Sequence, residues 1–122
     1  MSDYRFPKRA RLLRASEFER VFDARNSASD AWIVLYGAPN EFEHPRMGLT
    51  VSRRVGNAVV RNRWKRLLRE AFRLIQRDLP TLDLVCVVRV QTPPALDQLR
   101  NSLIALSGRL RARVEQRAAR KG

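Results

Sequence analysis

The residues best suited to chemistry gather between positions 53 and 70, in the run RRVGNAVVRNRWKRLLRE. Guanidinium groups grip phosphate oxygens through planar, paired hydrogen bonds, so this run suits the binding of phosphate. Within it, Glu70 is the only carboxylate. The cations are Arg53, Arg54, Arg61, Arg63, Lys65, Arg66 and Arg69. A merely solvated helix face usually carries acidic partners as well, so the run predicts a surface that meets a polyanion.

A second group could stack unpaired bases. Phe18, Phe22 and Tyr36 are aromatic, and rings near basic residues stack bases with little regard for sequence. The same rings also suit a plain core, because Phe18 and Phe22 lie four residues apart on one helix face. Spacing alone favours the core interpretation. Asn62, among the arginines, can donate and accept, which makes it a candidate for reading a base or a sugar hydroxyl.

The sequence offers little for bond breaking. His44 is the only histidine, so neither a histidine-based acid–base pair nor a multi-histidine metal site can form. The carboxylates Glu17, Glu19 and Asp23 suit the start and exposed side of a helix. Cys86 lies in an apolar run and is interpreted as a core residue. We therefore predict no catalytic residue, no metal ligand and no cofactor held by the chain.

Length and charge define the class. The 122 residues, 44% of them hydrophobic, suffice for one domain, and 25 Lys and Arg against 12 Asp and Glu give a net charge of +13. Such a charge favours nucleic acid as the partner. We expect a single RNA-binding domain over 1–122, with a basic arm at about 1–10 and a flexible basic tail at about 115–122. No membrane-spanning run or signal peptide is recognised, so we expect a cytoplasmic protein.

The first half of the chain predicts one helix and at least two strands. Ser16 and Glu19 have the spacing of a capping box, which predicts a helix that ends near Arg25. Residues 26–30 are interpreted as a turn. Residues 32–38 predict a strand, and 47–51 predict another, with Met47, Leu49 and Val51 toward the core and the alternating small polar positions left open.

The second half predicts a helix, a strand and a helix. Asn57 is the expected N-cap of a helix over about 58–77, whose apolar face includes Trp64. Residues 84–90 predict a strand. Pro93 and Pro94 suit the start of a last helix. Its apolar stripe is Leu96, Leu99, Leu103, Leu106 and Leu110. The whole predicts an α+β sandwich with helices laid on a sheet.

The run from Arg46 to Phe72 resembles the signature of the bacterial ribonuclease P protein subunit family, with its Arg-Asn-Arg core at 61–63. The resemblance includes RLLRASEFERVF at 11–22 and WIVLY at 32–36, and it covers nearly everything from Lys8 to about Arg113. It implies a two-layer sandwich in the order α-β-β-β-α-β-α, as in a domain of a ribosomal protein. It also implies a left-handed βαβ crossover, although handedness rules alone predict the opposite.

The resemblance further implies a role in removing the 5′ leader of precursor tRNA. A catalytic RNA subunit is the implied enzyme and would hold Mg²⁺ at its own active site, with no protein partner required. The family's RNA-subunit contacts correspond to Arg53, Arg54, Asn57, Arg61, Asn62, Arg63, Lys65, Arg66 and Arg69. Its leader cleft corresponds to Phe18, Phe22, Tyr36, Lys8, Arg9 and Arg11. This cleft assignment reverses the preference for plain core.

Rival functions differ in what they require. A non-catalytic ribosomal or ribosome-associated protein of the same fold would bind ribosomal RNA and stimulate no cleavage. A protein-only nuclease needs clustered acidic residues or histidines, which the sequence does not supply. A double-stranded DNA reader is less favoured, because no helix-turn-helix partner accompanies the basic helix.

Overall fold

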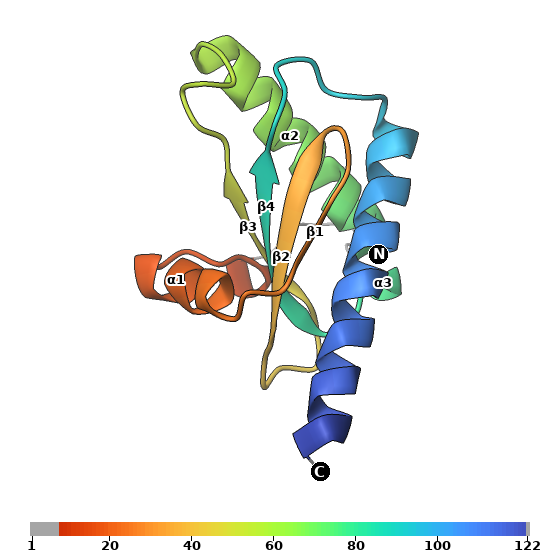
Figure 1. The fold of residues 1–122 in the computed structure, drawn as a ribbon. Helices are drawn as coiled ribbons and strands as arrows, with labels where there is room; N and C mark the ends of the chain where they lie inside the picture. The colour runs from red at the N-terminus through yellow and green to blue at the C-terminus, as the bar shows by residue number, and fades with distance from the viewer. Residues whose placement is uncertain (1–7, 122) are drawn as a thin grey trace.

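The computed structural model describes residues 8–121, which form three α-helices and a four-stranded sheet (Figure 1). The elements are η1 (Lys8–Ala10), α1 (Ala15–Asp23), β1 (Ser27–Ser29), β2 (Ile33–Pro39), β3 (Arg46–Thr50), α2 (Ala58–Ile75), η2 (Gln76–Asp78), β4 (Leu82–Val88) and α3 (Leu96–Lys121). The predicted order α-β-β-β-α-β-α is confirmed. Most of the predicted N-terminal arm lies outside the described residues.

The sheet has the strand order β1-β2-β4-β3. β2 pairs antiparallel with both β1 and β4, whereas β3 and β4 are parallel, with Leu49 opposite Cys86. α2 joins these two parallel strands. In Figure 1 both arrows point upward, β3 lies to the left of β4 and α2 passes behind the sheet, so the crossover is left-handed. The unit formed by β3, α2 and β4 thus belongs to the small minority of βαβ units with a left-handed crossover.

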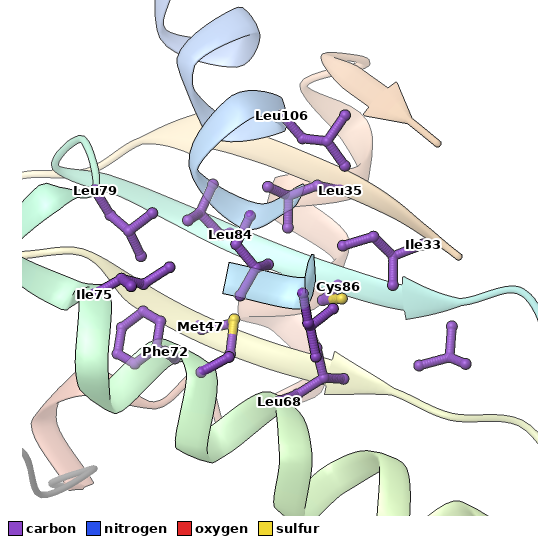
Figure 2. Close-up of a cluster of buried hydrophobic side chains, with 14 of the residues drawn as sticks. Ile33, Leu35, Met47, Leu68, Phe72, Ile75, Leu79, Leu84, Cys86 and Leu106 are labelled. Atoms are coloured by element: carbon purple, nitrogen blue, oxygen red, sulfur yellow. The ribbon is translucent and has the colours of Figure 1, made fainter. Parts of the chain in front are cut away.

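The main core lies between one face of the sheet and the helices α2 and α3. Figure 2 shows its centre, where Leu68 and Phe72 of α2 approach Met47 of β3 and Leu84 of β4. Cys86 is fully buried among them, as predicted, and burial raises the pKa of its thiol far above the usual range. This packing fixes α2 with its apolar face inward, so the rest of the helix points to solvent.

A smaller cluster lies on the opposite face of the sheet, under α1. Val21 is fully buried there, and Val85 of β4 is its neighbour in the cluster. Phe18, Phe22 and Tyr36 are half-buried and pack against this cluster. α1 contacts β2 and β4, so it covers only part of this second face.

Two local predictions need correction in the first half of the chain. The start of α1 is capped at Arg14 and Glu17, not at Ser16 and Glu19. The Glu17 carboxylate accepts backbone N–H bonds from Leu13 and Arg14, each at 3.1 Å, so the helix begins one residue before Ser16. Residues 27–29, interpreted as a turn, form the short edge strand β1, because β2 supplies a hydrogen-bonding partner.

The second half was predicted more closely, with one correction. Asn57 caps α2, and its side chain accepts the Val60 N–H at 3.0 Å, as predicted. β4 lies two residues earlier than predicted, because its pairing with β2 sets its limits. α3 stays helical through Lys121, so residues 115–121 continue the last helix, and the predicted flexibility of this tail stays a prediction. Helix-favouring residues there are aided by Arg117, which donates to the Ala24 carbonyl at 3.1 Å.

Candidate nucleic-acid interface

The outer side of α2 presents a continuous set of cations. Within residues 8–121, no ion pair or side-chain hydrogen bond is found for Arg63, Lys65, Arg66 or Arg69. Three of these side chains are exposed and Lys65 is half-buried. Glu70 pairs with Arg73. Because no carboxylate among residues 8–121 forms an ion pair with the four cations, their charge is available to an external polyanion.

These cations spread over three recesses of the surface. Asn62, Lys65, Arg66 and Arg69 line an open groove of about 410 Å³ along the helix, together with Glu70 and Arg73. Arg63 and Arg66 also border a recess next to residues 93–96, and Lys65 and Arg69 border another beside α1. Cations of α2 therefore border three separate recesses of the surface.

Two members of the predicted RNA-binding set have local structural roles. The side chain of Asn57 caps α2. Arg61 is half-buried, and its Nε donates to the Gly56 carbonyl at 3.2 Å, which ties the helix back to the loop before it. Arg53 and Arg54 lie exposed in that loop, next to the buried Val55. Which of these residues contact RNA stays a prediction.

The aromatic group lies on the other face of the sheet. The rings of Phe22 and Tyr36 meet edge to face, with centroids 4.9 Å apart. The Phe18 ring covers Gly48, where an added Cβ would lie only 2.5 Å from Phe18 Cζ. Gly48 is thus required for close approach of α1 to β3. Since the three rings are only half-buried, each ring supports the small cluster and also keeps some exposed surface. That these rings stack RNA bases stays a prediction.

A recess of about 210 Å³ brings the two predicted groups together. Arg11 and Phe18 line one side of it, and Lys65 and Arg69 of α2 line the other. The backbone of Leu12 donates to the Met47 carbonyl at 3.2 Å, which holds the N-terminal segment along the edge of β3. Lys8 and Arg9 are exposed at the start of this segment. No local pattern of residues predicted that the two groups meet at this edge.

A buried ionic network positions α1, and the sequence did not reveal it. Asp83, whose side chain is 0% exposed, pairs with Arg46 at 2.6 Å and with Arg20 of α1. Arg46 also pairs with Glu17 of α1 at 2.9 Å. Asn40 completes the network by donating to Asp83 at 2.9 Å. Because Glu17 and Arg20 flank Phe18 in the chain, these bonds fix where the aromatic group lies on the sheet.

The described residues show no group of three or more His, Cys, Asp or Glu side chains that could hold a metal ion. His44 is half-buried, and its ring centroid lies 5.4 Å from that of Phe42. Among residues 8–121, no helix is long and apolar enough to cross a membrane. The chain is thus a small basic α+β protein, and the cationic outer side of α2 suits the binding of a polyanion.

Comparisons with known proteins identify the family. A sequence model of the family described as Ribonuclease P matches residues 6–111. The "Ribonuclease P protein component" of Methylococcus capsulatus is 46% identical over 87 residues, which is 70% of this chain and 68% of that protein. The chain belongs to the ribonuclease P protein family, whose members are the protein subunit of ribonuclease P.

Solved structures agree with this assignment. The RNase P protein from Thermotoga maritima has a TM-score of 0.73 at 28% identity, covering 81% of this chain and 96% of that one. A mutant of the Staphylococcus aureus RNase P protein, described as defective in mRNA degradation, has a TM-score of 0.72 at 30% identity and covers 81% and 86%. The fold expected from the sequence resemblance is thereby confirmed.

Proposed function

We propose that this chain binds the catalytic RNA of ribonuclease P through the cations of α2 and holds the 5′ leader of precursor tRNA against the aromatic group. The observation that carries the proposal is the set of four α2 cations, Arg63, Lys65, Arg66 and Arg69, which have no ion-pair partner among residues 8–121 in a chain of this family. Such charges repel one another unless phosphates neutralise them. The expected setting is the bacterial cytoplasm.

In this mechanism the protein contributes binding and orientation, and the RNA contributes the chemistry. Guanidinium groups on α2 neutralise phosphates that crowd together where catalytic RNA and substrate meet. The recess lined by Arg11, Phe18, Lys65 and Arg69 gives an extended single strand both a ring to stack on and cations for its phosphates. Mg²⁺ is expected at the RNA active site, where it would supply the nucleophile and stabilise the leaving oxygen.

The proposal is tested by cleavage of precursor tRNA at low Mg²⁺ with the partner RNA subunit, with and without this chain. We expect strong stimulation by the chain, because it supplies positive charge that Mg²⁺ otherwise provides. We also expect the chain to tighten the binding of precursor tRNA and not that of mature tRNA, which has no leader. Turnover by the protein without RNA would contradict the proposal, and so would equal effects on both tRNAs.

A further inference from the structure

One recess on α2 is unlike the others. It has a volume of about 520 Å³ and lies between α2 and the segment that joins β4 to α3. Arg63 and Arg66 stand on one side, while much of the rest is apolar, with Leu67, Pro93 and Leu96 among its lining residues. A surface that only neutralised phosphates would have no use for an apolar hollow next to its cations.

The walls of this recess are held in place. The indole of Trp64, next to Arg63 in the chain, is fully buried, and its Nε1 donates to the carbonyls of Val90 and Gln91 at 3.0 and 3.1 Å. These bonds fasten α2 to the connection between β4 and α3, which passes α2 in Figure 1. Pro93 and Pro94 further restrict the backbone. The recess is therefore formed before any ligand arrives, so little ordering cost would oppose binding.

The chemistry of the recess suits one kind of ligand. Leu67 and Leu96 pack against the main core and are half-buried, so part of each stays available to an apolar, flat group. Arg63 and Arg66 have no ion-pair partner among residues 8–121 and suit a phosphate beside that group. Glu70, which also lines the recess, can accept a hydrogen bond from an amino group. An apolar face, a phosphate and an amino group together describe a nucleotide.

We propose that this recess accepts one unstacked nucleotide of the RNA subunit, with its base on the apolar wall and its phosphate on Arg63 and Arg66. The inference rests on the proposed function and deepens it, since it adds a position-specific contact to a surface otherwise suited to any phosphate backbone. Because Glu70 can accept a hydrogen bond from an amino group, it favours adenine, cytosine or guanine, the bases that have one. RNA is commonly recognised through such splayed-out bases.

The test fills the recess without removing a charge. Ala95 lines the recess, is exposed, and directly precedes α3, so Ala95→Phe places a ring in the hollow and leaves the core unchanged. We expect the affinity for the RNA subunit to fall roughly 5- to 150-fold, the value of one lost stack. The slope of log affinity against log salt should stay the same, because every phosphate contact remains.

Two control variants keep the result interpretable. Ala95→Ser leaves the recess open and suits the N-cap position directly before α3, so it should bind RNA like the wild type. Ala105→Phe adds the same ring to an exposed position of α3 outside the recess and should also be neutral. Denaturant unfolding of all three should show that Ala95→Phe is folded. Chemical probing of the complex should then reveal one unpaired nucleotide whose base is protected by the wild type and exposed with Ala95→Phe.

Unchanged affinity of Ala95→Phe would overturn the inference, and so would an unchanged base-protection pattern. A weaker salt dependence would also overturn it, because the ring would then have displaced cations instead of a base. These failures differ from failure of the proposed function. If the wild-type chain itself did not bind the RNA subunit, the proposed function would be contradicted. If the wild type bound normally and Ala95→Phe bound with the same affinity, only the proposed nucleotide site in the recess would be rejected.

Discussion

Two sets of arginines in this protein differ in what surrounds them. Arg46 and Arg20 meet Asp83, a carboxylate that is 0% exposed, and hold α1 on the sheet. Arg63 and Arg66 on α2 meet no carboxylate among residues 8–121. The first set is satisfied within the fold, and the second is available to a partner. Net charge alone therefore overstates the surface that can bind RNA, because part of the positive charge is used inside the protein.

The largest expected effect comes from breaking the buried network. Asp83→Ala removes the carboxylate on which Arg46 depends, and the Arg46 side chain is only 14% exposed. Loss of one partner of a buried pair costs about 3–5 kcal/mol, so the free energy of unfolding should fall by this amount in denaturant titrations. The matched control is Asp97→Asn, whose carboxylate is 85% exposed and should matter by less than about 1 kcal/mol. Similar losses for both variants would show that Asp83 is not structural.

The next effect comes from the α2 set and should leave stability alone. Arg66→Ala with Arg69→Ala should weaken RNA binding and lower the slope of log affinity against log salt by about 1 per removed cation. The control is Arg109→Ala with Arg120→Ala, which removes the same charge from exposed positions of α3. Unfolding free energies should stay within about 0.5 kcal/mol for both pairs. Equal loss of RNA binding by the control pair would mean that total charge, and not the α2 surface, decides affinity.

A smaller effect is expected at the aromatic group, where stability and binding overlap. Tyr36→Leu keeps an apolar side chain over the small cluster but removes the ring, so precursor tRNA binding should weaken by about 1–3 kcal/mol while mature tRNA is spared. Tyr36→Phe keeps the ring and should bind both as the wild type does. Binding assays with the reconstituted holoenzyme measure the difference. If Tyr36→Leu weakened the binding of precursor and mature tRNA equally, Tyr36 would be interpreted as a core residue without a role in binding the leader.

The smallest effect concerns pH. The pKa of Glu17 lies below its usual value of 4.5. The hydrogen bond from the Arg14 backbone N–H lowers this pKa most, and bonds from the Leu13 backbone and the Arg46 side chain lower it further, whereas burial opposes them. Glu17 therefore adds stability that is fully present above about pH 4.5 and is lost as the pH falls through its lower folded pKa. Unfolding titrations between pH 5 and 3 should show a shallower loss for Glu17→Gln than for the wild type.

A second carboxyl titrates in the same range and must be separated from Glu17. Burial alone would raise the pKa of Asp30, but hydrogen bonds from Ser102 and from the backbone of Ile33 and Trp32 outweigh it and lower the pKa. Asp30 thus also loses its contribution as the pH falls. Because this loss is common to the wild type and Glu17→Gln, the difference between their titrations reports Glu17. Identical curves would show that Glu17 does not contribute.

Local patterns predicted α2 well and β4 less well. The Asn57 cap and the apolar spacing around Trp64 act within a few residues of each other, so the sequence contains all that α2 needs. β4 is buried on both faces, which removes the alternation that would mark its ends. Its register depends on β2, about 50 residues away in the chain for the pair Leu35 and Cys86. The left-handed crossover was expected from family resemblance, not from handedness rules.

By itself the sequence determined the charge and the two-faced helix α2, because each depends on composition or short-range spacing. Only the tertiary structure decided which arginines are free. Arg20 and Arg46 are separated from Asp83 by 63 and 37 positions, and no local pattern signals their pairing. The recess next to Pro93 likewise arises where distant segments meet. Ion pairing and surface shape depend on distances in space, and those distances exist only once the chain has folded.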